Sequence, residues 1–331
     1  VSDKRSKRES AGIWPLSLVL FFWVLIGGLS VVAYRPPKPR PESIPPNQFS
    51  AIRAERILES LVGDAIPHPA GSPQNKIVRD RIVSLLKSFG YEVEIQSGDG
   101  PVAKWARGRS ADQERVELHN IIAKRSGTKP GKAIMLVSHY DSVAAGPGAS
   151  DDGLGTAALL EVARMIALEP DPKRDVVFLI TDGEELGMLG AKLFVNDHLL
   201  AKQIGIAINV EARGTSGPSC MFETSRMSRM LIPVFAGSNQ KQFASSLFYE
   251  IYKRMPNDTD FSVFKQNDIL GFNFAFIGDV KNYHTTADNF ENADRGSLQH
   301  HGDNAIGLIR QLQRWEQWDE LFASNDRLVD R

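Results

Sequence analysis

The stretch "AIMLVSHYDS" (residues 133–142) joins an apolar run to a histidine and an aspartate. The run reads as a buried strand that ends where the polar residues begin. Because side chains i and i+2 of an extended chain point to the same side, His139 and Asp141 can share one pocket. A carboxylate behind a metal-bound imidazole fixes its tautomer. An isolated H-x-D motif is more often an ordinary polar strand end, so its meaning depends on the rest of the chain.

The segments on both sides of this run predict alternating helices and strands. Apolar residues recur at helical spacing in 50–63, 75–90 and 155–170, and 174–182 contains a continuous apolar run. Strands that lack polar alternation and are separated by helices are typical of a parallel sheet covered on both faces. We therefore expect an α/β fold, a three-layer α/β/α sandwich with a mixed, centrally parallel sheet. Further strands are expected at 91–96, 114–125 and 204–211, and further helices at 187–197 and 296–325.

Composition excludes several classes of protein. The chain has 331 residues, of which 42% are hydrophobic, enough for a sizeable core. Its formal net charge is −1 and its basic residues are dispersed, so no nucleic-acid partner is indicated. Cys220 is the only cysteine, which excludes an internal disulfide and a zinc site built from several thiolates.

The N-terminal part predicts a membrane anchor. Residues 11–34 carry no charge, and a helix of this length crosses a hydrocarbon core of roughly 30 Å. Basic residues in 1–10 place that segment in the cytoplasm, and a cleavable signal peptide is the alternative. The Pro-rich segment 35–46 predicts an extended linker, and 47–331 predicts one folded domain. We expect a single-pass protein of a bacterial inner membrane, with this domain on the periplasmic or extracytoplasmic side.

Four polar clusters lie at the ends of predicted strands or in the loops after them. Because open α/β sheets bind ligands beyond the carboxyl ends of their parallel strands, the clusters should meet at one edge. Each cluster contains a residue type that can bind a metal. The clusters are "SHYDSVAAGPGASDDGLG" (138–155), "TDGEELGMLG" (181–190), "NVEARG" (209–214) and "NYHTTADN" (282–289).

The first two clusters combine a flexible loop with paired carboxylates. The glycines of "AAGPGA" let the chain fold back, so that Asp151 can approach a metal bound by His139. Asp152 opens the next helix and is expected to cap it or to order the loop. Glu184 and Glu185 are neighbours, so one can bind a metal while the other accepts a proton from water. Taken alone, this pair could equally cap a helix.

Glu211 and His284 complete the candidate set. Glu211 ends an apolar strand, where a carboxylate without a cation would be costly. His284 lies in a polar loop, where a lone histidine is usually structural. Together, two histidines and three carboxylates suit two zinc ions, bridged by one carboxylate and roughly 3.5 to 4 Å apart. Cobalt or manganese would accept the same nitrogen and oxygen ligands.

Three longer motifs resemble the two-zinc exopeptidases, a family that includes secreted bacterial aminopeptidases and the glutamate carboxypeptidases. These motifs are "HYDSVAAGPGASDDGLGTAALLE", "GEELGMLGAKLFV" and "YHTTADN", and the resemblance runs from about Pro67 to Arg310. The stretches "HPAGSPQN", "NDTDFSVF" and "LQHHGDN" look most like membrane metallopeptidases of the endoplasmic reticulum and the fungal vacuole. The resemblance therefore implies the zinc exopeptidase fold for 47–331.

The resemblance also implies a role for each matching residue. One zinc would be held by His139, Asp151 and Glu211. Asp151 would bridge to a second zinc, which Glu185 and His284 complete. The implied catalytic residues are Glu184 as general base, Asp141 as the carboxylate behind His139, and Tyr283 as a hydroxyl donor to the oxyanion.

Three further expectations concern neighbours of these residues. Many aminopeptidases of the family have aspartate where this chain has Glu211, which leaves the preferred peptide end open. The family pattern implies a cis peptide bond between Asp151 and Asp152. Arg213 is expected to pair with a carboxylate, either within the protein, which is the favoured reading, or at a substrate C-terminus.

These expectations add up to a membrane-anchored di-zinc metallopeptidase with a peptide substrate, and an aminopeptidase is favoured. A carboxypeptidase or dipeptidase on the same site remains an alternative. So does a glutaminyl cyclase, which shares the fold but works with one zinc. A non-catalytic receptor-like domain is the third alternative, although every ligand position is filled here. The oligomeric state is not indicated.

Overall fold

The chain folds into two compact units. The computed structural model describes residues 14–106, 114–238, 241–255 and 258–322. The units are Val1–Arg35 and Pro36–Arg331.

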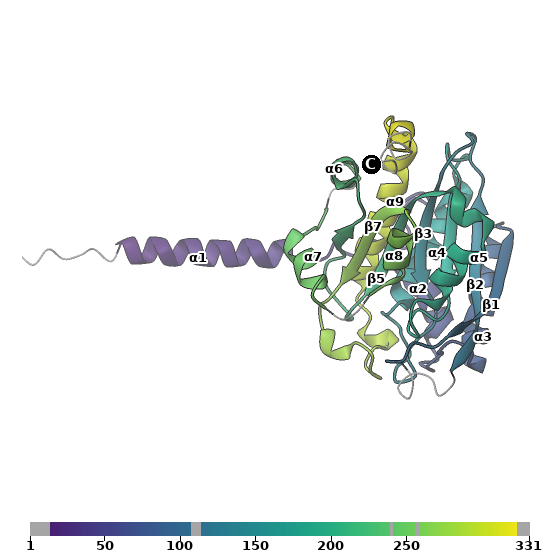
Figure 1. The fold of residues 1–331 in the computed structure, drawn as a ribbon. Helices are drawn as coiled ribbons and strands as arrows, with labels where there is room; N and C mark the ends of the chain where they lie inside the picture. Colours follow the sequence, from purple (N-terminus) through teal and green to yellow (C-terminus); the bar gives the residue numbers. More distant parts are fainter. Residues whose placement is uncertain (1–13, 107–113, 239–240, 256–257, 323–331) are drawn as a thin grey trace, which may run out of the picture. The chain divides into compact units, whose positions relative to one another are not determined.

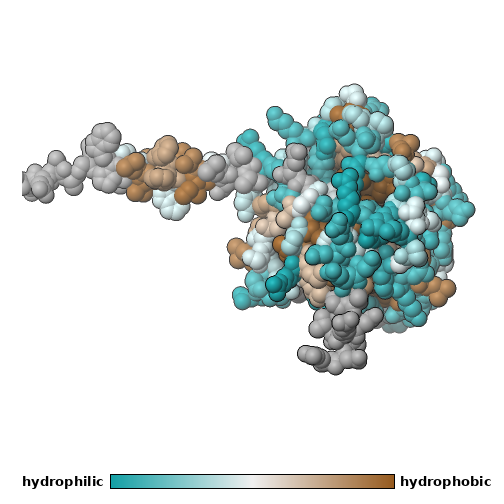
Figure 2. All heavy atoms as spheres, turned by 90° about the horizontal axis from the view of Figure 1, so that it is seen from above, coloured by the Kyte–Doolittle hydropathy of each residue, from teal (hydrophilic) through white to brown (hydrophobic). Residues whose placement is uncertain are grey.

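The first unit contains helix α1 (Trp14–Ala33), which lies within the apolar segment predicted as an anchor. From Leu18 to Ile26 its large apolar side chains are exposed, and they give this helix its brown surface in Figure 2. Within the part of the chain that the structure describes, no helix meets the combined length and hydropathy needed to cross a membrane. Residues 1–10, predicted to be cytoplasmic, lie outside the described residues.

A mixed sheet forms the centre of the second unit (Figure 1). Its described strands have the order β1-β2-β4-β3-β5-β7-β6. Strand β3 pairs in parallel with β4 and β5, and β5 pairs in parallel with β7. The outer pairs β1–β2, β2–β4 and β6–β7 are antiparallel. The prediction of a mixed, centrally parallel sheet is therefore confirmed. The strands are β1 (Val93–Pro101), β2 (Arg115–Arg125), β3 (Ala133–His139), β4 (Val176–Thr181), β5 (Ile204–Ala212), β6 (Cys220–Thr224) and β7 (Leu270–Phe276).

Helices cover both faces of this sheet because the central strands alternate their side chains between two cores. In β3, Ile134 and Leu136 belong to one apolar cluster, and Met135 and Val137 belong to another. The first core is covered by α2 (Ala51–Val62), α3 (Pro73–Ser88), α4 (Gly153–Leu168) and α9 (Arg295–Arg314), and the second by α5 (Leu189–Asp197) and α8 (Asp260–Gln266). The remaining short helices are α6 (Ser228–Ala236), α7 (Ser246–Tyr252), η1 (Leu199–Gln203), η2 (Val280–Asn282) and η3 (Phe290–Asn292).

Helix α9 is shorter than the predicted 296–325. It ends at Arg314, and Trp315 adopts φ −66° and ψ 115°, outside the helical region. The guanidinium of Arg174 donates hydrogen bonds to the carbonyl oxygens of Leu312 and Gln313, at 3.2 and 3.0 Å. A cation at the carbonyl end stabilises a helix terminus, so Arg174, far away in sequence, stabilises the end of α9.

The Pro-rich segment groups with the second unit from Pro36 onward. The Arg40 amide donates to Gln299 Oε1 at 2.8 Å, and the Arg40 guanidinium pairs with Asp303. The Ser50 hydroxyl lies 3.0 Å from the Arg40 carbonyl oxygen and also caps α2. These contacts hold the segment around Arg40 against α9 and the start of α2.

Candidate metal centre

Four adjacent strands deliver the candidate ligands to one edge of the sheet. His139 is the last residue of β3, and Glu211 is the penultimate residue of β5. Glu184 and Glu185 lie in the loop after β4, and His284 lies in the loop after β7. Strands β4, β3, β5 and β7 are consecutive in the sheet and parallel to one another. Their carboxyl ends therefore lie side by side, where open α/β sheets bind ligands.

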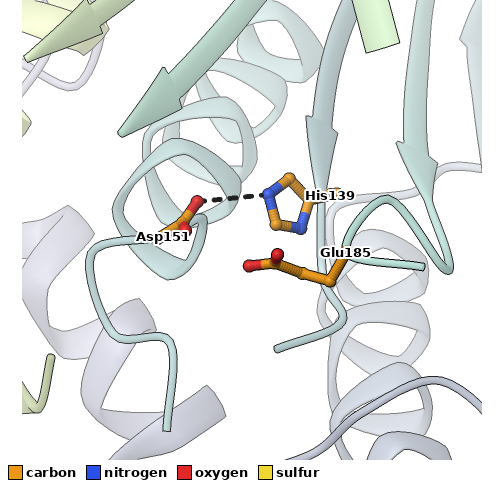
Figure 3. Close-up of side chains that lie close together, drawn as sticks. All are labelled: His139, Asp151 and Glu185. Carbon is orange, nitrogen blue, oxygen red and sulfur yellow. Dashed lines mark ion pairs between the residues drawn. The ribbon is translucent and has the colours of Figure 1, made fainter. Parts of the chain in front are cut away.

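Five side chains, with Asp151 among them, converge there. His139 Nε2 lies 3.3 Å from Asp151 Oδ1 and 3.6 Å from Glu211 Oε2. His284 Nε2 lies 3.1 Å from Asp151 Oδ2 and 3.0 Å from Glu185 Oε1. Asp151 thus directs its two oxygens to two different histidines. Figure 3 shows His139, Asp151 and Glu185 pointing toward one another.

The ring of His139 is oriented by a backbone oxygen. Its Nδ1 lies 3.0 Å from the carbonyl oxygen of Asp141, so Nδ1 carries the proton and donates it. Because Nδ1 is engaged in this way, Nε2 is the nitrogen left to act as a ligand. The Asp141 carboxylate, expected behind the imidazole, is farther away, at 3.5 Å from Nδ1.

The Asp141 carboxylate has a second task. Its Oδ1 accepts from the Glu184 amide at 3.0 Å, and its Oδ2 accepts from the Glu185 amide at 3.2 Å. Asp141 is 1% exposed, so both bonds are shielded from water. One aspartate therefore fixes the loop that carries both glutamates, while its carbonyl oxygen fixes His139.

The loop that carries Asp151 is held by Asp288. The two oxygens of Asp288 accept from the amides of Ser150 and Asp151, at 2.7 and 3.1 Å. Gly148 lies in the left-handed region, at φ +62°, and a Cβ there would come within 2.6 Å of the Asp151 carbonyl oxygen. The peptide bond between Asp151 and Asp152 is cis, as the family resemblance implied. Asp152 stands at the N-cap of α4 without a capping bond, and its Oδ2 accepts from the His139 amide at 3.3 Å.

The electrostatics of the cluster reflect crowded carboxylates. Burial and the charge of Asp151 raise the pKa of Glu185 to about 8. Burial and the nearby Glu211 raise the pKa of Glu184 well above its usual value. Burial opposes a charged imidazole at His139, but Glu211 and its other acidic neighbours outweigh this and raise the His139 pKa well above its usual value. A bound divalent cation relieves this kind of mutual repulsion.

The donor atoms themselves fit a metal. The buried atoms His139 Nε2 and Glu185 Oε1 make no hydrogen bond, although each lies close to a polar atom of another candidate ligand. Nitrogen and oxygen donors of His139, Asp151 and Glu185 lie within 4.8 Å of one another, and so do those of His139, Asp152 and Glu211. Buried polar atoms that aim at a shared point instead of at each other are typical of a ligand set.

Tyr283 lines the same edge. Its ring stacks on the ring of His284, with centroids 3.7 Å apart. His284 itself lies at φ +57°, a left-handed conformation that turns its imidazole back toward Asp151 and Glu185.

Some residues that support the candidate ligand Glu211 were not predicted from the sequence. The Asn209 amide donates to Glu211 Oε1 at 3.4 Å and to Asn273 Oδ1 at 3.0 Å. Strand alternation could have predicted the place of Asn209, because it precedes Glu211 by two residues and lies on the same face of the strand. His301 donates from Nε2 to the Glu211 carbonyl oxygen at 3.1 Å. No local pattern indicates that contact.

Named relatives are similar in sequence to most of this chain. The vacuolar membrane protease of Candida albicans (strain WO-1) is 31% identical over 254 residues, which cover 74% of this chain and 28% of that protein. Endoplasmic reticulum metallopeptidase 1 of Mus musculus is 29% identical over 282 residues, or 80% of this chain and 31% of that protein. The chain thus spans under a third of the length of these relatives.

Solved structures share the fold at lower sequence identity. A zinc aminopeptidase from Bacillus subtilis has a TM-score of 0.64 and 16% identity, covering 81% of this chain and 96% of its own. A glutaminyl cyclase from Porphyromonas gingivalis has a TM-score of 0.62 and 19% identity, covering 79% of this chain and 98% of its own. The sequence model of peptidase family M28 matches residues 120–309, a range that contains all the candidate ligands. The chain belongs to peptidase family M28.

Proposed function

We propose that residues 47–331 form a two-zinc aminopeptidase. The observation that supports two ions is the placement of Asp151, whose oxygens lie 3.3 and 3.1 Å from the Nε2 atoms of two different histidines. A carboxylate that binds a single ion has no need of a histidine at each oxygen. The zinc aminopeptidase among the structural neighbours and the metallopeptidase among the relatives are consistent with this proposal.

Five residues would hold the ions. His139, Asp151 and Glu211 would bind one, and Asp151, Glu185 and His284 the other. Bound zinc would supply Lewis acidity toward water and toward the carbonyl oxygen of the peptide bond.

Glu184 would move the proton. Its raised pKa suits a group that takes a proton from the attacking water and returns it to the leaving amine. The Asp141 hydrogen bond to the Glu184 amide would hold this carboxylate in position. The hydroxyl of Tyr283, whose ring stacks on His284, would donate to the oxyanion.

The test uses the purified chain in detergent. After removal of metal with a chelator, zinc is titrated back, and bound zinc per chain is measured by mass spectrometry of the metal. Peptides of one sequence with a free or an acetylated N-terminus are then compared. The expected result is two zinc ions per chain, hydrolysis of the free-amine peptides, and no hydrolysis of the acetylated peptides.

Other results would point to the alternatives. Equal cleavage of the free-amine and the acetylated peptides, with release of the C-terminal residue, would identify a carboxypeptidase. One zinc per chain, with cyclisation of N-terminal glutamine, would identify a glutaminyl cyclase. Two bound zinc ions with neither reaction would indicate a non-catalytic domain.

We also propose that the segment containing α1 anchors the domain to a membrane. The uncharged stretch 11–34 and the names of the membrane-protease relatives support this proposal. A single pass through a bacterial inner membrane, with the domain outside, stays a prediction from the sequence, and the relatives named above are from a yeast and a mammal. Extraction of the full chain by carbonate, without detergent, would contradict the anchor.

A further inference from the structure

Arg213 is held beside the candidate metal centre by two loops that are fastened together. It follows Glu211 by two residues, and its amide donates to the Phe276 carbonyl oxygen at 2.9 Å. The Thr215 amide donates to the Gly278 carbonyl oxygen at 2.9 Å, and the Asn282 side chain donates to Thr215 Oγ1 at 2.9 Å. The loop after β5 is therefore fixed against the loop that leads from β7 to Tyr283.

The guanidinium of Arg213 lies over the ring of Tyr283. Its Cζ is 5.3 Å from the ring centroid, within the range of a cation–π interaction. The same tyrosine ring stacks on His284, a candidate ligand. A fixed positive charge thus stands next to the place where a substrate would meet the metal centre.

The described residues offer this cation the ring of Tyr283 but no carboxylate. Arg213 Nη1 is buried and makes no hydrogen bond, and no carboxylate among the described residues forms an ion pair with Arg213. Arg53 shows the ordinary arrangement, since it pairs with the buried Glu161 at 2.7 Å. Leaving part of a guanidinium buried and unpaired is unfavourable unless an anion completes it.

Acidic side chains of the adjoining loops interact with other donors. Asp151 and Glu185 face His284. Asp279 accepts from the Ser216 hydroxyl at 2.7 Å, and Asp294 accepts from the Ser297 amide at 2.7 Å. The expected structural pairing of Arg213 with a carboxylate of the protein is therefore absent from the described residues.

We propose that Arg213 binds a carboxylate of the substrate, so that the preferred substrates are short peptides whose C-terminal carboxylate lies close to the scissile bond. This inference rests on the proposed peptidase function and narrows its substrate class. A guanidinium matches a carboxylate through two parallel hydrogen bonds. Each added residue moves the terminus away by roughly 3.5 Å, so a fixed arginine selects for length.

The test compares three dipeptides: alanyl-alanine, its C-terminal amide, and the C-terminal amide of alanyl-aspartic acid. In the third peptide only the side-chain carboxylate is free. Alanine is used because nearly any pocket accepts a methyl group. In Arg213→Gln we expect kcat/KM for the free dipeptide to fall about 30- to 100-fold, mostly through KM. The amide should change less than twofold. If the aspartyl peptide behaves as the free dipeptide does, a side-chain carboxylate also binds; if it behaves as the amide does, only the terminus binds.

A matched variant and a binding measurement accompany this test. Arg226→Gln removes another arginine, which pairs with Asp268 at 3.2 Å on the surface. This variant should leave kcat/KM unchanged for both substrates. Arg213→Lys should lose part of the preference, because a lysine keeps the charge without the two-pronged geometry. Calorimetry on zinc-loaded Glu184→Gln measures the preference for dipeptide over amide without turnover.

Two results would overturn the inference. One is an equal loss of kcat/KM for the free dipeptide and for the amide in Arg213→Gln. That result would mean that Arg213 positions Tyr283 or stabilises the fold. The other is no preference for a free carboxylate in the calorimetric experiment. Hydrolysis of the amide by the unmodified chain would leave the proposed peptidase function standing in either case.

Discussion

His301 Nε2 donates a hydrogen bond to the backbone oxygen of Glu211 across 3.1 Å. The other ring nitrogen of His301 lies 2.8 Å from the Ser219 hydroxyl and accepts from it when the imidazole is neutral. Burial lowers the pKa of His301 to about 3, in agreement with that state. A helix on one side of the sheet therefore holds the strand end that presents a candidate ligand on the other side.

Removing this support should weaken metal binding. We expect His301→Asn to lower zinc affinity about 10- to 100-fold, because partners behind a ligand contribute that much. Competition with a chromogenic chelator measures the affinity. His300→Asn is the matched control, since His300 binds the Ser219 amide and the Lys241 carbonyl oxygen and not Glu211. Equal affinities in the two variants would remove the supporting role of His301.

Asp141→Asn should reduce turnover more than it reduces metal content. One of the two oxygens that accept from the Glu184 and Glu185 amides would become an NH2 group facing an N–H. A displacement of the loop by about 1 Å can cost a factor on the order of 100 in kcat. Steady-state kinetics and metal analysis on the same sample make the comparison. An unchanged kcat would show that the loop keeps its place without this carboxylate.

Glu184→Gln should keep the two proposed zinc ions and lose nearly all turnover. Glutamine preserves the shape of the side chain but cannot accept and return a proton, and general bases contribute roughly 100- to 10,000-fold. Glu185→Gln is the informative neighbour, because it should lose metal as well. Substantial hydrolysis by the zinc-loaded Glu184 variant would mean that another group takes the proton.

Acid should destabilise the fold through His300. Burial lowers its pKa to about 4 in the folded protein, below the usual value of 6.5. The neutral form is therefore favoured by folding, and its contribution is complete above pH 6.5 and lost as the pH falls toward 4. At pH 5 the loss is about 2 kcal/mol relative to pH 7.5.

Denaturant unfolding of metal-free protein at these two pH values tests that loss. Other groups titrate in the same range, so the quantity of interest is the difference between the unmodified chain and His300→Asn. The variant should lose about 2 kcal/mol less on acidification. If both proteins lost the same free energy of unfolding on acidification, His300 would not be the cause of the pH dependence.

Much of the central architecture could be predicted from the sequence because its signals are local. The apolar run 133–139 and its neighbour 174–182 correspond to β3 and β4, and helical spacing in 155–170 corresponds to α4. Between β5 and α9 no helix or strand was predicted, although β7 lies in an apolar run comparable to that of β3. Helix α7 has only 7 residues, too few for helical periodicity to be recognised, and the left-handed Met227 and Asp268 turn the chain abruptly.

The candidate site divides along the same line. His139, Glu184 and Glu185 lie in compact motifs that the eye finds in the sequence, and the structure places their side chains at one edge. The supports from Asp288 and His301 act through backbone atoms of residues distant in sequence. Any residue has a backbone amide and carbonyl, so contacts of this kind leave no mark on the composition of either partner.

The origin of the ligands on separate strands gives metal uptake a diagnostic value. Side chains alternate along a strand, and slippage by a single position would turn His139 or Glu211 to the opposite surface. A misassembled sheet could still be compact and rich in β-structure, yet it would be unable to take up the ions. Zinc capture by freshly folded chains is therefore a quality check on strand alignment, independent of any catalytic assay.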